Sequence, residues 1–351
     1  MRAAAACLFA LTAMLVAACG SDEPLRGPSP LLLKAIDRMS DQDFAVPLEG
    51  GQAALLPMFS EKKLVGVHSG VKRVVVGIQD PARNAGLVFD TLKKAVGEGA
   101  ETMIVVPQFI AAQDAEKHGL GPEFARWTIE GWIEGGMSRP ANLRDTGPIV
   151  SSFTVLDAVI LYLADRATFP DLAEIRLVGY GRSARTVQLY AAVAKGLGAA
   201  AGAGIKVRFV VANADSFVYF DERRPSRGES PFEPFEREKC PGFNLWPYGL
   251  SVPAVYAYGT IGADLARRYA GLEVVYLVDE RDTASTDRDC EARTQGRDRL
   301  ERAQNYLKYL AVVAGGEAAS HRLVTTRAGS GGIAGLLAGQ CGQSVLAGGG
   351  C

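Results

Sequence analysis

Short runs of apolar residues, many of them valine and isoleucine, recur along the chain and alternate with longer amphipathic stretches. Such runs, bounded by polar or turn-forming residues, are typical of buried strands. The strands predicted from these runs are 73–78, 102–107, 175–180, 207–213, 272–278 and 322–326. Apolar residues at helical spacing predict helices over 89–96, 152–166, 186–196 and 299–313.

This alternation predicts an α/β fold with a mostly parallel central sheet and helices on both faces. The segment 221–250 interrupts this alternation of strands and helices, because it follows a strand and is rich in proline, arginine, glutamate and phenylalanine. Long excursions at that edge of a sheet are often lids or pocket walls. An uninvolved surface loop is the alternative.

Composition and charge narrow the classes of partner. The chain has 351 residues, of which 48% are hydrophobic, so it can bury a large core. Its formal net charge is −1 with both signs interspersed, so nothing predicts a nucleic-acid partner. It has no Walker A or dinucleotide-binding fingerprint, and no cofactor is predicted. The acidic residues within 279–289 lack the spacing of a zinc site and the ligand order of an EF-hand, so no metal site is predicted.

The first residues have the pattern of an export signal. A positive start at Met1 and Arg2 precedes an apolar run over 3–18 that is short for a membrane span. The run ends LVAAC at 15–19, which resembles the lipobox of bacterial lipoproteins. That resemblance implies cleavage before Cys19 and lipidation of its thiol, with an ordinary secretory signal as the alternative.

The predicted organisation is therefore a signal peptide over 1–18, a lipidated N-terminus and tether over 19–32, and one domain over 33–351. The tether is polar and rich in proline and glycine. Gly20 after the cysteine, in place of aspartate, resembles an outer-membrane sorting signal. We therefore expect a protein of the bacterial cell envelope, whose partner is a membrane reached through the lipid.

The segment 177–184 (LVGYGRSA) joins a predicted strand to a predicted helix. At this place α/β-hydrolases carry a G-x-S-x-G turn with the nucleophilic serine at its centre. Further segments resemble bacterial secreted hydrolase-like proteins of this fold in order and spacing: 151–157 (SSFTVLD), 187–191 (VQLYA), 210–213 (VVAN), 240–244 (CPGFN) and 290–292 (CEA). From about Arg73 to Gly348 the chain resembles the α/β-hydrolase superfamily, which implies that fold.

The resemblance implies that the catalytic positions have changed. Gly181 stands at the serine position and Gly331 at the position of the histidine after the last strand. The loop after the first strand usually carries a His-Gly pair and here has Gln79 and Asp80, and a carboxylate there would oppose an oxyanion. Asp282 matches the acid, with a loop aspartate that caps a turn as the alternative.

Ser183 is the alternative nucleophile. A shift of the motif by two residues would place Arg185 where a small residue is needed, so a structural role or a helix N-cap is preferred for Ser183. A serine also needs a base, and the histidines are His68, His118 and His321. His321 begins the last predicted strand, about 20 Å from the strand's far end.

Four cysteines follow the predicted signal: Cys240, Cys290, Cys341 and Cys351. In an exported protein they can form disulfides in three connectivities, which the sequence does not choose between. The family resemblance places Cys290 and Cys341 near adjacent elements and so implies a bridge between them. Free buried thiols are the alternative.

These observations predict a membrane-anchored α/β-hydrolase-fold lipoprotein that is catalytically inactive and has a binding or structural role. The first alternative is a serine esterase that uses Ser183. The partner would be an envelope protein or a small apolar ligand. A pocket for such a ligand is predicted around Gly181, Phe217, Trp246 and Gly331.

Overall fold

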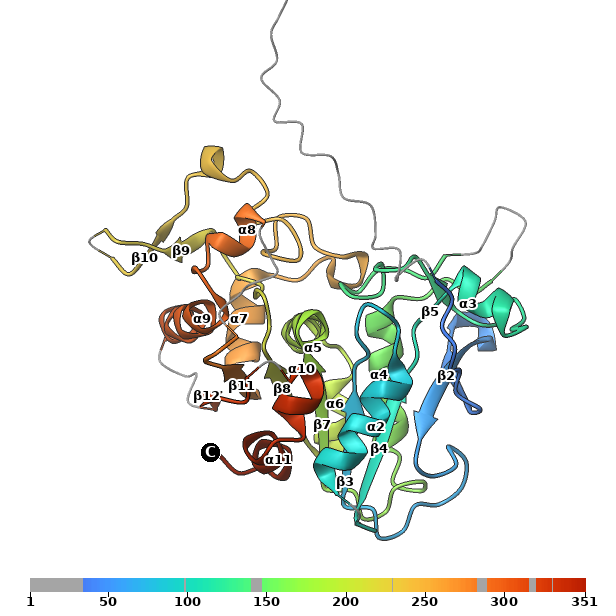
Figure 1. Ribbon diagram of the computed structural model, residues 1–351. Coiled ribbons are helices and arrows are strands. Elements are labelled where there is room, and N and C mark those ends of the chain that lie inside the picture. Colours follow the sequence, from blue (N-terminus) through green and yellow to red (C-terminus); the bar gives the residue numbers. More distant parts are fainter. Residues whose placement is uncertain are drawn as a thin grey trace, which may run out of the picture.

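The structure is a computed structural model that describes residues 34–97, 99–139, 147–228, 230–282, 289–315, 320–329 and 331–351 (Figure 1). The predicted signal peptide and tether, with the lipidation site Cys19, lie outside the described residues. None of the described helices combines the length and the apolar character that a membrane crossing requires.

Eight strands form one sheet in the order β1-β2-β4-β3-β7-β8-β11-β12. Strands β1 and β2 pair antiparallel, as do β2 and β4, and the remaining neighbours are parallel. Their bounds are β1 Asp43–Pro47, β2 Ala53–Ser60, β3 Arg73–Gly77, β4 Thr102–Pro107, β7 Glu174–Tyr180, β8 Lys206–Ala212, β11 Glu273–Asp279 and β12 His321–Thr326. All six predicted strands are confirmed, and β1 and β2 were missed.

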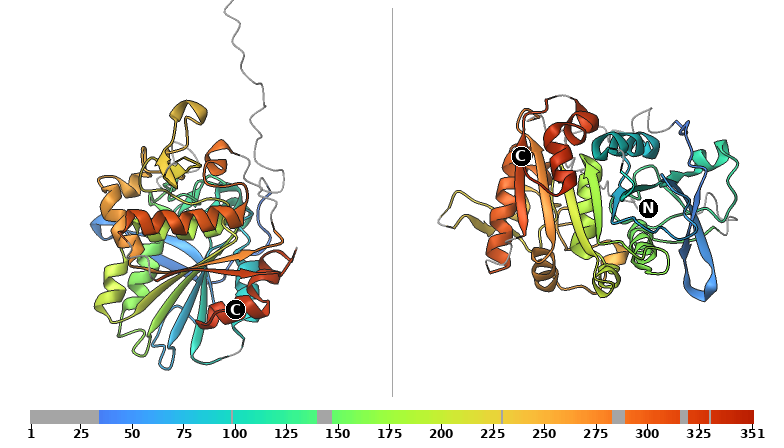
Figure 2. Two further views of the ribbon diagram at one scale, coloured as in Figure 1. Left: turned by 90° about the vertical axis from the view of Figure 1, so that its left-hand side faces the viewer. Right: turned by 90° about the horizontal axis from the view of Figure 1, so that it is seen from below.

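Helices cover both faces of the sheet, as Figure 2 shows from two directions. One face packs against α2 (Ala85–Val96), α10 (Gly332–Leu337) and α11 (Gln340–Ala347). The other packs against α4 (Ser152–Ala164), α5 (Arg182–Val193), α6 (Leu197–Gly202), α7 (Gly262–Ala270) and α9 (Arg299–Val313). Successive residues of a strand point to opposite faces, so Leu177 belongs to one core cluster and Val178 to the other.

Loops at the carboxyl ends of the strands carry the smaller elements. After β4 come β5 (Ile110–Ala111), α3 (Ala112–Lys117) and β6 (Arg126–Trp127). The 221–250 excursion contains the hairpin β9 (Arg223–Pro225) and β10 (Phe232–Pro234), followed by a 3-10 turn at Arg237–Lys239. In Figure 1 this hairpin lies beside α8 (Cys290–Arg293), at the end of the sheet where the parallel strands finish.

The disulfides differ from the expected bridge between Cys290 and Cys341. Cys240 pairs with Cys290, which ties the excursion to α8, and Cys341 pairs with Cys351. The prediction was wrong because α8 and α11 are far apart in space. Helix α8 lies at the carboxyl ends of the strands, whereas α11 packs on the sheet near their amino ends (Figure 1).

Candidate active site

The chain passes from β7 into α5 through a single residue, Gly181. Its backbone has φ 59° and ψ −121°, a conformation that favours glycine over residues with a side chain. The Gly181 N–H donates to the carbonyl of Ala212 at 2.8 Å, which fixes the turn against β8. Gly181 therefore occupies the apex of a sharp strand-to-helix turn, the position of the nucleophile in the predicted motif.

Gly179 permits this turn. A Cβ added there would lie 2.3 Å from the carbonyl oxygen of Ser183 and 2.7 Å from the nitrogen of Ala184, so the first turn of α5 could not lie this close to β7. A Cβ added to Gly181 would meet nothing within 4 Å. The apex thus has room for a side chain but offers no nucleophilic atom.

Ser183 lies inside the first turn of α5 and is 1% exposed. Its hydroxyl accepts from the Tyr180 N–H at 3.1 Å and donates to the Tyr180 carbonyl at 2.9 Å. The prediction that it caps a helix starting near 186 was wrong, because α5 begins at Arg182 directly after the glycine apex. Ser183 instead closes the turn by bonding both backbone groups of Tyr180.

Two arginines on α5 form ion pairs with the loop that follows β6. Arg182 pairs with Glu130, and Arg185 pairs with Glu134 at 2.9 Å. The Arg185 guanidinium is buried and lies over the ring of Tyr248, 5.5 Å from its centroid. Since Tyr248 belongs to the 221–250 excursion, that segment contacts the helix after the apex.

Of the residues predicted to line a ligand pocket, Phe217 and Trp246 are held by aromatic packing. Phe217 stacks on Tyr306 of α9, with ring centroids 4.7 Å apart. Trp246 packs edge-on against Phe153 and donates from Nε1 to the carbonyl of Glu134 at 2.8 Å. The apolar ligand site stays a prediction.

The acid position, Asp282, follows β11. Its Oδ2 accepts from Asn213 Nδ2 at 3.0 Å and from Arg299 Nη1 at 2.5 Å. Arg299 also contacts Asp215 Oδ1 at 2.8 Å, so one buried guanidinium joins two carboxylates. In a triad this acid accepts from a histidine N–H. The side chain that caps the adjoining turn belongs to Asp279, which accepts from the Arg281 N–H at 3.0 Å.

This charge cluster lies against the residue before the apex. Burial raises the pKa of Tyr180, and the carboxylate of Asp282 contributes to the shift. Asn213 acts on both groups, because it opposes the rise of the Tyr180 pKa and its Nδ2 donates to Asp282. The acid position and the elbow are therefore close in space, as the predicted motif requires.

At the histidine position, Gly331 caps α10. A Cβ added to Gly331 would lie 2.7 Å from the Cα of Gly335, so the backbone of α10 leaves no room for a side chain. Arg327, which lies four residues before Gly331, is exposed and pairs with Glu280 at 2.9 Å.

The three histidines lie elsewhere. His321 is the first residue of β12 and pairs in register with Val274, at the amino ends of the strands, whereas Gly181 follows the carboxyl end of β7. Its Nε2 contacts the carbonyl of Tyr269 at 2.8 Å, and burial lowers its pKa. His68 packs on an aromatic ring of the core, and His118 ends α3.

In the loop after β3, the side chains of Gln79 and Asp80 are both hydrogen-bonded to the backbone. Gln79 is buried and donates from Nε2 to the carbonyl of Phe109 at 2.8 Å. The Asp80 carboxylate accepts from the Asn84 N–H at 3.2 Å, and burial raises its pKa. The Gln79 amide nitrogen is thus engaged by the Phe109 carbonyl, and an ionised Asp80 side chain is an acceptor that would oppose a negatively charged oxygen.

One group of potential metal ligands comes together in the described ranges, Cys240, Cys290 and Glu291. The two sulfurs are bonded to each other, so neither is a thiolate that could bind a metal ion. This group is part of the disulfide link between the excursion and α8.

Comparison with known proteins supports the fold. No family model and no curated protein matches the sequence. The structure is similar to poly(aspartic acid) hydrolase-1 from Sphingomonas sp. KT-1, with a TM-score of 0.54, 16% identity, and 85% of this chain and 96% of that chain covered. It is also similar to LpqC, a poly(3-hydroxybutyrate) depolymerase from Bordetella parapertussis, with a TM-score of 0.54, 16% identity, and coverage of 90% and 91%.

The chain has an α/β-hydrolase fold. The β7–α5 turn is the place where the sequence predicts a nucleophile elbow, and the loop after β11 is the place where it predicts the acid. The structure brings Gly181, Ser183 and Asp282 to one end of the sheet, together with Arg299. Arg299 was missed as part of the site, because its contact with Asp282 arises only when α9 packs beside β11.

Proposed function

We propose that this protein is a lipid-anchored, non-catalytic member of the α/β-hydrolase superfamily with a binding role in the bacterial envelope. The observation that carries the proposal is the apex of the elbow, where Gly181 has the backbone conformation of a nucleophile position and no side chain. An acyl-enzyme needs a nucleophilic atom at this point.

The rest of the site supports the same conclusion. Asp282 is engaged by Arg299 and Asn213, and Gly331 has no space for a histidine side chain. Loss of a complete triad lowers turnover by about 10⁶-fold, and the residual catalysis depends on an intact oxyanion hole. In the corresponding loop the Gln79 amide nitrogen donates to the Phe109 carbonyl, and the Asp80 carboxylate would oppose a negative charge.

A hydrolase that uses Ser183 is not favoured. The hydroxyl would have to leave both of its hydrogen bonds to Tyr180, and the first turn of α5 would have to open before substrate could reach it. Ser183 is also far from the buried His321, which lies at the opposite end of the sheet.

The binding role is proposed for the carboxyl end of the sheet. There the excursion contacts α5 through Tyr248, and Arg182 and Glu130 remain partly exposed. These residues present paired charges beside aromatic side chains, which suits an envelope protein more than an apolar small molecule. The membrane anchor is proposed from the lipobox-like LVAAC segment ending at Cys19.

The test of inactivity is hydrolysis of short-chain and long-chain p-nitrophenyl esters by the purified protein, together with labelling by a fluorophosphonate probe. We expect no turnover above buffer and no labelled serine. The matched variants are Ser183→Ala and Ser69→Ala, the latter in an exposed turn. Turnover that disappears in Ser183→Ala and persists in Ser69→Ala would overturn the proposal.

The anchor has a separate test. Cells that express the protein and are fed an alkyne analogue of palmitate should label it, and the label should be absent in Cys19→Ser. Wild-type protein that remains unlabelled and is released from membranes by salt would contradict the anchor without bearing on the loss of catalysis.

A further inference from the structure

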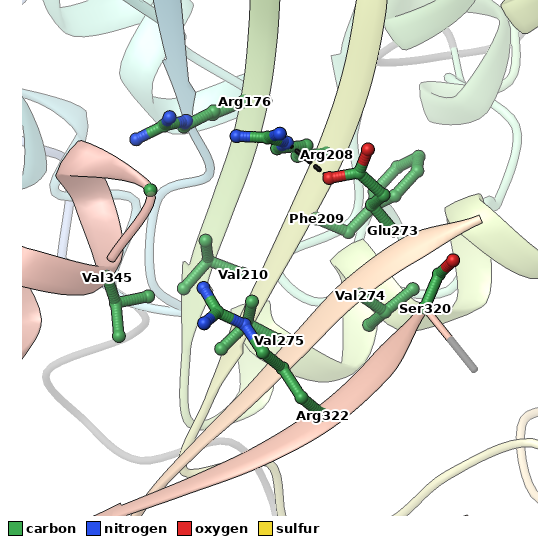
Figure 3. Close-up of a pocket in the computed structure, with 11 residues that line it drawn as sticks. Arg176, Arg208, Phe209, Val210, Glu273, Val274, Val275, Ser320, Arg322 and Val345 are labelled. Atoms are coloured by element: carbon green, nitrogen blue, oxygen red, sulfur yellow. Dashed lines mark ion pairs between the residues drawn. The ribbon is translucent and has the colours of Figure 1, made fainter. Parts of the chain in front are cut away.

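A cavity of about 290 Å³ lies at the amino ends of β7, β8, β11 and β12, between the sheet and α11. It is at the end of the sheet opposite to the elbow. Figure 3 shows Arg208 extending toward Arg176, while Arg322 reaches from β12 toward Val345 on the other side of the space. The cavity is thus bordered by three guanidinium groups from three different strands.

The charges around this cavity do not balance among the described residues. Glu174 contacts Arg73, Arg176 and Arg208, and Glu273 contacts Arg208. Arg322 donates to the carbonyl of Gly349 at 2.6 Å and has no carboxylate partner in the described ranges. The lining thus contains three arginines and one carboxylate, Glu273, while Glu174 beside it is shared among three arginines, so positive charge is in excess among the described residues.

Arg176 has a buried guanidinium that is only partly paired among the described residues. Its side chain is 1% exposed, and its Nε is paired with Glu174. Its Nη1 is buried without a hydrogen-bond partner among the residues that the structure describes. Burial lowers the pKa of Arg176, and the positive charges of Arg73 and Arg208 lower it further, against the raising effect of Glu174. A buried charged donor without an acceptor is costly, and a bound anion would remove that cost.

Beside the arginines, Glu273 and Ser320, the lining has an apolar part that includes several valines. Val210 and Val275 come from the sheet, and Val345 comes from α11 on the opposite wall. The tail after α11 is fixed beside Arg322 by the disulfide between Cys341 and Cys351. The cavity therefore combines a cationic border with a valine surface, which suits a molecule that has an anionic group and an aliphatic part.

We propose that this cavity binds a small organic anion, whose carboxylate or phosphate group lies between Arg176, Arg208 and Arg322 and whose aliphatic part lies on Val210, Val275 and Val345. Guanidinium groups bind both head groups through paired N–H donors, so the shared chemistry is an anionic oxygen group. The site is independent of the proposed loss of catalysis, because it shares no residue with the elbow.

Isothermal titration of the purified protein tests this site. The probes are octanoate and octyl phosphate, with 1-octanol as the neutral molecule of the same chain length and inorganic phosphate as the head group alone. We expect saturable binding of at least one anionic amphiphile, weaker at high salt, and no binding of 1-octanol. The tighter of the two amphiphiles identifies the head group.

The variant is Arg322→Gln, at the exposed border, and its matched control is Arg327→Gln near the other end of β12. We expect Arg322→Gln to weaken binding about tenfold or more and Arg327→Gln to leave it unchanged. Circular dichroism melting checks that both variants are folded. A second variant, Arg208→Gln, should weaken binding in the same direction.

Three outcomes would overturn the proposal. One is the absence of saturable binding of either amphiphile to the wild-type protein. The second is 1-octanol binding as tightly as octanoate, which would remove the role of charge. The third is equal loss of affinity in Arg322→Gln and Arg327→Gln. If inorganic phosphate binds as tightly as octyl phosphate, the assignment of an aliphatic part to the valine surface is wrong.

Discussion

The arginines at the two ends of the sheet differ in how completely they are paired with carboxylates. At the carboxyl end each arginine around the elbow has its own carboxylate: Arg182 has Glu130, Arg185 has Glu134, and Arg299 has both Asp215 and Asp282. At the amino end Arg176, Arg208 and Arg322 border a cavity. The residues that the structure describes supply too few carboxylates to match them and no acceptor for a buried N–H of Arg176.

The two arrangements of charge have different consequences for stability and for ligand binding. Charges that are paired within the protein are less available to a small anionic ligand. Charges in excess beside a cavity gain most when an anion arrives. The carboxyl end, where we propose contact with an envelope protein, thus presents paired charges, whereas the amino end presents an excess of positive charge beside a cavity.

The largest expected effect is at the paired end. Arg299→Met leaves Asp215 and Asp282 without their shared guanidinium, and removal of one partner of a buried ion pair costs about 3–5 kcal/mol. Urea unfolding should report a loss of this size. The control is Arg297→Met, two residues earlier and 82% exposed, which should change little. Equal effects of the two substitutions would show that the pairing at this end does not stabilise the fold.

Removal of a disulfide should have the next-largest effect on stability, and the two disulfides should differ in the size of that effect. Cys240 and Cys290 are 50 residues apart, and Cys341 and Cys351 are 10 apart. Loop-closure entropy then predicts that the paired serine variants lose about 4 and about 3 kcal/mol, respectively. Thermal unfolding of both double variants measures the order. Peptide mapping without reduction checks the pairing, and a linked Cys290–Cys341 peptide would refute it.

Ser183→Ala should have a smaller effect. The Tyr180 N–H loses its acceptor in a buried turn, so the free energy of unfolding should fall by about 1–3 kcal/mol. Ser69→Ala, in an exposed turn, is the control. Unchanged stability of Ser183→Ala would mean that the hydroxyl is not needed for the elbow, and the structural role assigned to it would be wrong.

The smallest expected effect is the dependence of folding stability on pH. Burial lowers the pKa of His321 and of His68 below 6.5, so the unfolded chain binds protons that the folded chain does not. The stability that depends on these neutral rings is complete above pH 6.5 and is lost as the pH falls toward the folded-state values. Denaturation at pH 7.5 and 5.5 should show the loss. His321→Gln should flatten the slope, and an unchanged or steeper slope in this variant would contradict the prediction.

Much of the fold could be predicted from the hydrophobic pattern. All six predicted strands formed, and the helix over 299–313 has the predicted bounds. The antiparallel edge was missed, because β1 is half exposed and β2 contains Pro57 in its middle. The start of α5 was placed four residues late, since no pattern of apolar residues marks a helix that begins directly after a strand.

The sequence by itself identified the positions at which local backbone geometry restricts the type of residue. Gly179 can be recognised because a close helix contact leaves no room for a side chain, and Gly181 because a positive φ favours glycine. Only the tertiary structure decided which side chains meet: Cys240 with Cys290, Arg299 with Asp282, and Arg176, Arg208 and Arg322 around one cavity. These partners come from different strands and helices, and their distances depend on sheet order and helix packing, which no local sequence pattern encodes.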